Sequence, residues 1–462
     1  MASRGLKSLD GAALGIDRIE ALRSAFRGQL VSGGDTDYET GRRIWNASID
    51  RHPGVIARCA GVADVVEAVN FARENGVLVA VRGGGHNVGG RALCDDGMVI
   101  DLSRMKGIHV DAQNRRARVQ GGALLGDVDR ETHLFGLAVP TGIISKTGIA
   151  GLTLGGGVGW LVRKYGLTCD NVLSFEIVTA DGKVLIASAA ENKDLFWALR
   201  GGGGNFGVVT SFEYRLHPVS TVLGGLILYP RDQATTVLRH YREFMKSAPD
   251  ELAVYAGLLS APDGTPVVAL IACHCGELEE GEAALKPLRA LGTPLMDAIQ
   301  PMPFPKMQSL LDGGFPDGAL NYWKSAFLRE LGDDAIQTVI DHANRALSPQ
   351  TAVVLEYYGG AAGRVGASET AFAHREAAYS LGILCRWTDP AESPRQIAWT
   401  RGFAEAMRPY YSGAYLLNFL DAEEHDTIRA AFGSNYDRLV AVKNRYDPTN
   451  FFHLNQNIKP TA

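Results

Sequence analysis

Helix-like and strand-like hydrophobic patterns alternate along the first part of the chain. Residues 63–74 carry apolar side chains at 65, 66, 69, 71 and 72, a spacing that predicts an amphipathic helix. Asn75-Gly76 ends this helix, and the apolar run 77–81 predicts a buried strand. Together with a short strand predicted within 53–59, this gives a β-α-β unit. Its second strand leads directly into a glycine-rich segment, Arg82-Gly-Gly-Gly-His-Asn-Val-Gly-Gly90.

The pattern changes near residue 218, where His217-Pro218 ends the glycine-rich part of the chain. Before it, the spacing predicts strands over 98–102, 116–120, 173–180 and 208–214 and helices over 124–135 and 194–200. After it, we predict strands over 254–259, 267–275 and 351–358, helices over 279–291, 333–346 and 396–407, and a last helix over 426–432. We therefore predict an α+β protein with three parts, residues 1–218, 219–419 and 420–462.

Glycine is enriched in loops of the first part. The chain has 54 glycines in 462 residues, which is roughly 12% against an average of ~7%. Most of the excess lies before residue 210, in blocks at 82–90, 148–159 and 201–207. Because glycine has no Cβ, such loops let backbone N–H groups approach an anion closely. The blocks therefore indicate a cradle for a phosphate-bearing cofactor.

Two common nucleotide-binding folds are excluded by the order of these elements. Gly202, Gly204 and Gly207 form a G-x-G-x-x-G motif, but a predicted helix precedes it and a predicted strand follows it. A dinucleotide-binding Rossmann unit needs the opposite order, a strand and then a helix. The sequence also lacks the G-x-x-x-x-G-K-[ST] motif of P-loop proteins.

Composition and charge exclude several partners. The formal net charge is −5 with no basic run, so nucleic acid and acidic membrane surfaces are not expected partners. No apolar run approaches ~18 residues, and the first ten residues lack the apolar core of a signal peptide. The six cysteines are scattered without C-x-x-C spacing, so we expect reduced thiols, no metal site and a cytoplasmic protein.

The three glycine blocks and the tail Tyr436–Ile458, in this order, resemble the flavin-linked oxidases of the vanillyl-alcohol-oxidase superfamily. The most similar branch contains berberine bridge enzyme, glucooligosaccharide oxidase and 6-hydroxynicotine oxidase. The resemblance implies a PCMH-type FAD-binding domain of two α/β subdomains in residues 1–218. It implies an inserted α+β substrate domain with an antiparallel sheet in 219–419. The segment 420–462 would return to the FAD domain.

The resemblance also implies how the cofactor is held. The loop Arg82–Gly90 would cradle the FAD pyrophosphate, and His86 would be bonded covalently to the 8α-methyl group of the flavin. The residues expected to bind FAD are Arg82, Gly83, Gly84, Gly85, His86, Asn87, Gly90, Thr147, Gly148, Gly151, Leu152, Gly155, Gly156, Gly159, Trp160, Asn171, Gly207, Val209, Asn455 and Asn457. For Trp160 a packing role under the glycine loops is the alternative.

Two positions in the second glycine block distinguish this chain from many relatives. Related enzymes have a second flavin link through a cysteine in Gly-x-Cys-Pro-x-x-Gly, where this chain has Ile144. Because Ile144 has no thiol, we predict a flavin linked through His86 alone. At the position of Thr147, relatives use valine to admit oxygen and leucine to block it. Threonine is close to valine in size, which favours an oxidase.

The candidate base is Glu356, a carboxylate inside the apolar strand pattern of Val354–Tyr358. The resemblance implies that polar side chains of this strand, including Tyr358, face the flavin. Desolvation would raise the pKa of Glu356 toward a range useful for proton transfer. The alternative for Glu356 is an exposed edge position or a structural salt bridge.

The other positions where relatives carry catalytic groups differ here. An acid or amide seven residues before a tryptophan is replaced by Ser380, counted back from Trp387. Phe419 stands where many relatives have a catalytic tyrosine, and it has no hydroxyl group to act as a base. Tyr415 and Asn418 are candidates for orienting the substrate, although a tyrosine in a strand more often packs in the core.

We therefore expect an FAD-dependent oxidase that transfers hydride from a small-molecule alcohol, amine, sugar or phenolic metabolite to the flavin, with O₂ as electron acceptor and H₂O₂ as product. Two alternatives stay open from the sequence. One is a dehydrogenase with another acceptor, and the other is a flavin-binding protein without turnover. Either a monomer or a homodimer is compatible with the sequence.

Overall fold

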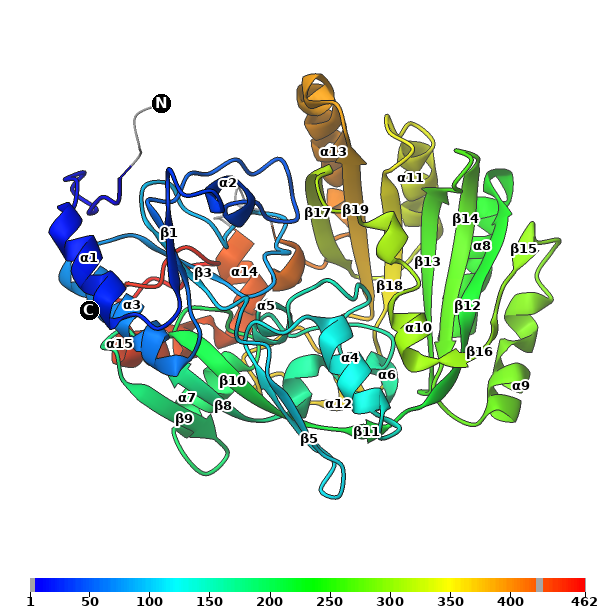
Figure 1. Cartoon of the computed structure of the whole chain (residues 1–462). Helices are drawn as coiled ribbons and strands as arrows, with labels where there is room; N and C mark the ends of the chain where they lie inside the picture. Colours follow the sequence, from blue (N-terminus) through cyan, green and yellow to red (C-terminus); the bar gives the residue numbers. More distant parts are fainter. Residues whose placement is uncertain (1–4, 421–426, 462) are drawn as a thin grey trace.

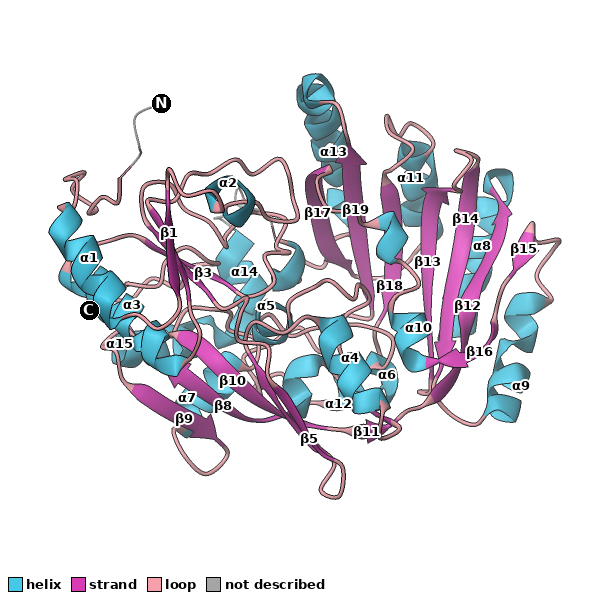
Figure 2. Ribbon diagram, in the orientation of Figure 1, coloured by secondary structure: helices cyan, strands magenta, loops and turns pink. Residues whose placement is uncertain are grey.

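The chain folds into two lobes, one on each side of a central cavity (Figure 1). This computed structural model describes residues 5–420 and 427–461. The first lobe contains two small sheets, and the second contains one large twisted sheet with helices on its outer face (Figure 2). Helices and strands are both abundant, and most of the strands pair in antiparallel fashion. This confirms the predicted α+β class.

The first lobe is built on a four-stranded and a five-stranded sheet. The four-stranded sheet has the order β1 (Gln29–Ser32), β2 (Val55–Arg58), β4 (Met98–Asp101) and β3 (Val79–Arg82). The five-stranded antiparallel sheet has the order β5 (Ile108–Asp111), β6 (Arg116–Gln120), β10 (Val208–Arg215), β8 (Val172–Val178) and β9 (Val184–Ser188). The helices of this lobe are α1 (Ile16–Ala25), α2 (Tyr38–Gly41), α3 (Val62–Glu74), α4 (Leu125–His133), α5 (Ile149–Leu154), α6 (Val162–Tyr165) and α7 (Lys193–Leu199).

The predicted β-α-β unit is confirmed as β2-α3-β3, with β4 inserted between its two strands. β2 and β3 both pair with β4 in parallel. The apolar face of α3 is buried against this sheet through Val65, Ala68, Val69 and Ala72. The glycine-rich segment therefore leaves the carboxyl end of a buried parallel strand, a common place for a ligand-binding loop.

The second lobe is a large antiparallel sheet. Its order is β15 (Met296–Asp297), β12 (Thr221–Pro230), β14 (Pro266–His274), β13 (Leu252–Ser260), β18 (Ala352–Tyr357), β19 (Tyr379–Trp387) and β17 (Leu320–Leu328), with β16 (Gln300–Pro303) also paired to β12. Short β7 (Leu137–Ala138) and β11 (His217–Pro218) pair at the junction of the lobes. The helices of this part are α8 (Ala234–Met245), α9 (Leu278–Arg289), α10 (Phe304–Gln308), α11 (Asp333–Ala343), α12 (Gly360–Arg364) and α13 (Ser393–Met407).

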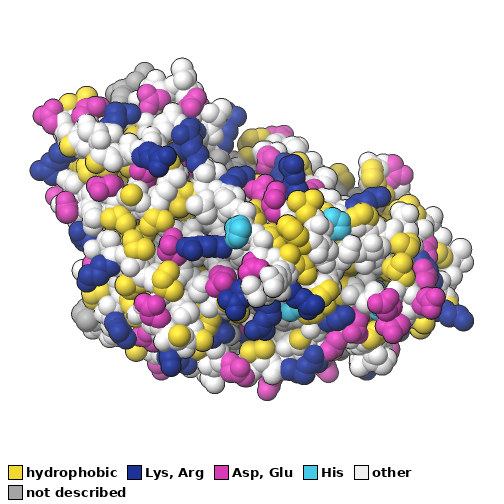
Figure 3. All heavy atoms as spheres, turned by 60° about the horizontal axis from the view of Figure 1, so that its bottom comes forward, with side chains coloured by type: hydrophobic (Ala, Val, Ile, Leu, Met, Phe, Trp, Pro, Cys, Tyr) yellow, Lys and Arg dark blue, Asp and Glu magenta, His cyan; other side chains and the backbone are white. Residues whose placement is uncertain are grey.

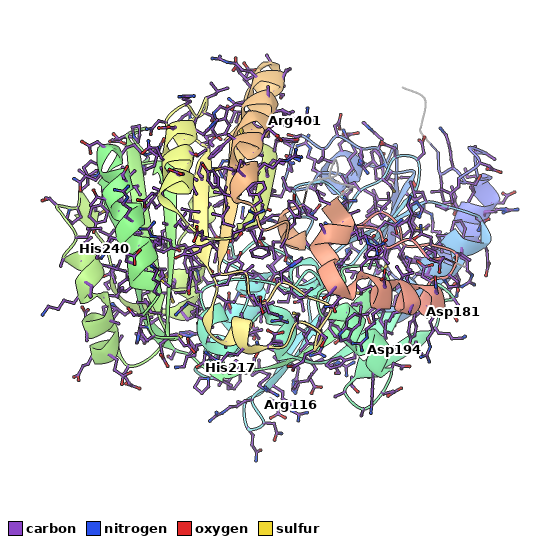
Figure 4. The ribbon with its side chains drawn as sticks, turned by 180° about the vertical axis from the view of Figure 1, so that it is seen from behind. Arg116, Asp181, Asp194, His217, His240 and Arg401 are labelled. Carbon is purple, nitrogen blue, oxygen red and sulfur yellow. The ribbon has the colours of Figure 1, made fainter. Side chains whose placement is uncertain are left out.

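The two faces of the large sheet have different partners because side chains alternate along each strand. Val353, Leu355, Leu381 and Ile383 point outward and form a core with α8, α11 and α13. Viewed from behind, these helices cover the outer face, and α13 carries the labelled Arg401 (Figure 4). The alternate positions of the same strands face the cavity between the lobes.

The end of the chain returns to the first lobe. α14 (Ile428–Phe432) and α15 (Tyr436–Tyr446) lie beside the first lobe (Figure 1), and Leu439 and Val442 of α15 share a core with α7 and the five-stranded sheet. A buried Lys443 holds the tail in place. Its Nζ donates to Asp447 at 2.5 Å, to the Asn205 carbonyl at 2.8 Å and to the Phe452 carbonyl at 3.0 Å.

Two predicted elements differ from the structure. The segment around Tyr415 is not a strand, because a short 3₁₀-helix, Leu417–Phe419, turns it toward α5. The predicted helix over 426–432 begins at Ile428, and residue 426 lies outside the described residues. The other predicted helices and strands begin and end within three residues of the predicted bounds, whereas further elements, such as α8, α15 and β12, were not predicted.

Positive and negative side chains are interspersed on the face shown in Figure 3, without a continuous region of one sign. Within residues 5–420 and 427–461, no helix has the length and apolar character needed to cross a membrane. All six cysteines are free and buried.

Candidate active site

A cavity of about 490 Å³ lies between the glycine-rich loops of the first lobe and the inner face of the large sheet. Three segments of the first lobe line it, at 83–87, 142–158 and 203–209, together with the tail at 452–456. The opposite wall comes from β13, β18, β19 and β17. Segments far apart in the sequence therefore meet in one enclosed space.

Two glycine loops touch each other beside the cavity. An added Cβ on Gly84 would lie 2.5 Å from the backbone N and Cα of Gly148, and a Cβ on Gly148 would lie 2.4 Å from the backbone N of Gly84. No other residue fits at either position without moving a backbone. A β-bridge between Leu124 and Gly148 fixes the second loop at this contact. Because of this contact, the two loops together form one continuous side of the cavity.

His86 lies in the cavity wall at the end of this first loop. Its ring stacks on Trp45 with centroids 4.3 Å apart, and its Nε2 is buried without a hydrogen-bond partner in the protein. Burial lowers the pKa of His86 to about 4, so the imidazole is neutral near pH 7. A neutral ring with an unpartnered nitrogen is suited to forming a bond to an electrophilic ligand atom.

The residues around the cavity fit a bound FAD. The amide oxygens of Asn87, Asn418 and Asn455 are buried without a protein hydrogen-bond partner, and all three residues line the cavity. Buried polar atoms normally have partners, so these atoms indicate a polar ligand. The paired loops at Gly84 and Gly148 offer backbone close to the cavity with no Cβ in the way.

Glu356 lies on the opposite wall, in the middle of the large sheet. β18 pairs with β13 on one side and β19 on the other. Glu356 is 6% exposed and forms no ion pair with another residue in the described ranges 5–420 and 427–461. The edge-strand and salt-bridge alternatives are therefore not what the structure shows. Burial raises the pKa of Glu356 to about 7, while a hydrogen bond from the Tyr358 hydroxyl to Oε2, at 2.6 Å, acts in the opposite direction.

Most of the predicted site residues meet at this cavity. Those that line it are Gly83, Gly84, Gly85, His86, Asn87, Thr147, Gly148, Gly151, Leu152, Gly155, Gly207, Val209, Glu356, Asn418 and Asn455. Those that do not line it are Arg82, Gly90, Gly156, Gly159, Trp160, Asn171, Tyr358, Tyr415 and Asn457.

Several residues of the second group have another role. The Arg82 guanidinium donates to the Asp101 carboxylate at 2.6 Å and to the Gly41 carbonyl, which anchors the start of the glycine loop. Trp160 stacks on Tyr255 with centroids 5.0 Å apart, in agreement with the packing alternative.

Both polar groups of the Asn171 side chain have hydrogen-bond partners in the protein. Its Nδ2 donates to the carbonyls of Tyr165 and Leu167, and its Oδ1 lies 2.7 Å from His217 Nε2. His217 is labelled in Figure 4, near the lower edge of the molecule. The structure therefore does not bring the Asn171 side chain to the cavity.

Most of the cavity wall formed by the sheet was not predicted from the sequence. Gly257, Val354 and Gly382 lie side by side on adjacent strands and form a flat patch, because the two glycines have no side chain to raise it. Trp323 and Arg386 also line the cavity. The sequence pattern that could have predicted this wall is the alternation Ser380-x-Gly382-x-Leu384-x-Arg386. It places these four residues on one face of β19.

Comparisons with known proteins agree with this geometry. An FAD binding domain family matches residues 53–188, and a berberine and berberine-like family matches 414–459. An FAD-linked oxidoreductase of Dictyostelium discoideum is 34% identical, covering 94% of this chain and 95% of its own. The (R)-6-hydroxynicotine oxidase of Paenarthrobacter nicotinovorans is 33% identical, covering 94% of this chain and 97% of its own.

The chain belongs to the berberine bridge enzyme-like family of FAD-linked oxidoreductases. Among solved structures, the crystal structure of 6-hydroxy-D-nicotine oxidase from Arthrobacter nicotinovorans has a TM-score of 0.86 and is 32% identical, covering 94% of this chain and 98% of that one. The fold is the α+β fold of the PCMH-type FAD oxidases, and the predicted family is confirmed. This berberine bridge enzyme-like protein is therefore an oxidoreductase with FAD as its cofactor.

Proposed function

We propose that the protein is an FAD-dependent oxidase of a small-molecule alcohol, amine, sugar or phenol, with its flavin linked covalently through His86 alone. The neutral, unpartnered imidazole in the cavity wall supports the link. Ile144 also lines the cavity, and its aliphatic side chain cannot form a thioether. A relative named as an oxidase of 6-hydroxynicotine supports a small-molecule substrate.

The observation that carries the proposal is the position of Glu356. It is buried in the cavity wall opposite His86, and its hydrogen-bond partner, the Tyr358 hydroxyl, is uncharged. Ser380 lies directly opposite Glu356 on the neighbouring strand. The resemblance predicted an acid or amide at the position of Ser380, so in this chain the acid comes from the adjacent strand. A carboxylate with a pKa of about 7 is well placed to accept a proton near neutral pH.

In the proposed reaction, Glu356 removes a proton from the O–H or N–H of the substrate, and Tyr358 holds the carboxylate in position. A bound FAD would supply the acceptor for the hydride of the substrate C–H bond, and O₂ would take up the two electrons to give H₂O₂. Burial of Glu356 keeps water away from its carboxylate and maintains its raised pKa. Asn418 lies in the same cavity, where its free Oδ1 is available to a ligand.

Thr147 supports O₂ as the electron acceptor. It lines the cavity in the segment after Ile144, and its side chain is close to valine in size. A small side chain at this position leaves room for O₂, which favours an oxidase over a dehydrogenase.

The test is a panel of alcohols, amines, sugars and phenols assayed for H₂O₂ release, comparing the wild type with Glu356→Gln. We expect H₂O₂ with at least one compound class and a loss of about 10²-fold or more in the variant. Glu330→Gln is the matched control, because Glu330 is exposed and lies outside the cavity.

Three results would count against the proposal. Turnover that is unchanged in Glu356→Gln would remove Glu356 as the base. Substrate-dependent reduction of an artificial dye without H₂O₂, together with reoxidation of the reduced flavin in air that takes minutes, would indicate a dehydrogenase. A flavin that no compound in the panel reduces would indicate a flavin-binding protein without turnover.

A further inference from the structure

On the sheet wall of the cavity, the part away from Glu356 contains hydrogen-bond donors without matching acceptors. Arg386 Nε and Trp323 Nε1 are both buried and have no partner in the protein. Both residues line the cavity. Both also contact Phe315, whose ring centroid is 6.0 Å from that of Trp323 and 5.1 Å from Arg386 Cζ. Two unsatisfied donors therefore lie around one aromatic ring.

The positive charge of Arg386 is not balanced by the protein. Its Nη2 donates to the Gln350 carbonyl at 2.9 Å, and no carboxylate within residues 5–420 and 427–461 forms an ion pair with it. Burial lowers the pKa of Arg386, and no neighbouring charge contributes to the shift. Arg386 is partly buried, and a partly buried cation without an anionic partner favours a ligand that supplies one.

Strand geometry separates this end of the cavity from Glu356. Ser380, Gly382, Leu384 and Arg386 alternate on the inner face of β19, and Ser380 lies opposite Glu356. Six residues of strand separate the backbone of Ser380 from that of Arg386 by roughly 20 Å at ~3.4 Å per residue. The intervening wall is apolar and flat, formed by Val354, Gly382 and Leu384.

We infer that the substrate of this enzyme carries a carboxylate, which binds Arg386 and Trp323 while the reacting C–H bond lies at the other end, beside Glu356. This inference rests on the proposed function and narrows its substrate class. A planar carboxylate matches the fork of a guanidinium, and the apolar wall between the two ends suits an aromatic or aliphatic body. The carboxylate orients the substrate and takes no part in the transfer of hydride.

The test uses the flavin-loaded protein and three acids paired with their primary amides, which have the same shape without the charge. The pairs are 4-phenylbutanoate, 6-phenylhexanoate and 8-phenyloctanoate, each with its primary amide, so that the series covers an increasing part of the wall between Arg386 and Glu356. Binding is measured from the change in the visible absorption of the flavin and by calorimetry. We expect at least one acid to bind the wild type roughly tenfold tighter than its amide.

Matched variants separate recognition of charge from a packing role. Arg386→Gln should remove the preference for the acid, and Arg386→Lys should retain part of it. Trp323→Phe keeps an aromatic side chain, with a smaller ring, and loses the N–H donor, so it should weaken binding of the acid by roughly threefold. Arg395→Gln, which removes an exposed arginine from α13, should leave the preference unchanged.

The inference fails if no acid binds better than its amide, or if Arg386→Gln weakens each acid and its amide equally, which indicates packing alone. Either result with H₂O₂ release intact would leave the proposed oxidase function in place. Absence of H₂O₂ release and of flavin reduction across the wider panel would instead contradict the proposed function itself.

Discussion

At the scale of single residues, His86 combines features that an ordinary core histidine lacks. A buried ring nitrogen usually has a hydrogen-bond partner, yet Nε2 of His86 has none. Burial also keeps the imidazole neutral at pH values well above 4. The ring stacks on Trp45, with the two centroids 4.3 Å apart. These features suit a residue whose nitrogen bonds to a ligand.

We predict that His86→Ala abolishes the covalent attachment of the flavin. Because Ile144 offers no second attachment point, any flavin still bound should be released when the variant is precipitated with acid, and the pellet should be colourless. His109→Ala, an exposed position on β5, should retain yellow, acid-resistant flavin. A yellow pellet from His86→Ala would show that another residue forms the link.

The pair Glu356 and Tyr358 sets the pH dependence expected of the enzyme. Glu356 must be ionised to accept a proton, and its pKa is about 7. We therefore predict that kcat/KM rises with pH below 7 and levels off above it. The Tyr358 hydroxyl donates to the carboxylate and stabilises its charged form, which lowers the pKa of Glu356. In Tyr358→Phe the rise should move to higher pH.

The measurement is the initial rate of flavin reduction without O₂ across a pH series, so that reoxidation does not limit the rate. Tyr357→Phe is the matched control, because Tyr357 faces the helix-covered side of the same strand. The assignment of Glu356 would be wrong if the profile of Tyr358→Phe coincided with that of the wild type.

At the scale of elements, hydrophobic spacing was enough to predict helices such as α3 and strands such as β14. It was not enough for the segment around Tyr415, whose apolar residues also suit a strand. In the structure, Asn418 Nδ2 donates to the carbonyl of Leu152 on α5 at 3.1 Å, and the chain turns at Leu417–Phe419. That interaction joins residues more than 260 positions apart, so no local pattern contains it.

The residues of the site also fall into those that could be predicted from the sequence and those that could not. The glycine loop and His86 could be predicted because each lies within one short segment with an unusual composition. The wall formed by Gly257, Val354 and Gly382 could not, because it depends on the register of three strands that the chain brings together from distant positions. The burial of Glu356 could be expected from its place in an apolar strand, but its pairing with Ser380 could not.

At the scale of the whole molecule, the tail completes the first lobe. Asn205 follows the third glycine block, and its side chain donates to the Gln456 carbonyl and accepts from the Ile458 N–H. The same tail places Asn455 in the cavity wall. Residues more than 240 positions apart thus form one side of the site, and their arrangement depends on how the tail is anchored.

The anchor is the fully buried ion pair between Lys443 and Asp447. Asp447 also accepts hydrogen bonds from the N–H groups of Phe451 and Phe452, at 2.7 and 2.9 Å, and so shapes the turn that precedes Asn455. Removing one member of a buried pair leaves the other charge without a partner in a medium of low polarity. The carbonyls of Asn205 and Phe452 would lose their donor as well.

We predict that Lys443→Met lowers the free energy of unfolding by about 3–5 kcal/mol, measured by urea denaturation of the flavin-loaded protein. Arg445→Gln, two residues along the same helix, breaks an exposed ion pair with Asp194 and should change stability by about 1 kcal/mol or less. Because the anchor holds the wall of the cavity, Lys443→Met should also weaken the binding of ligands such as the acids above. Equal stability of Lys443→Met and Arg445→Gln would show that the tail is held by its apolar contacts alone.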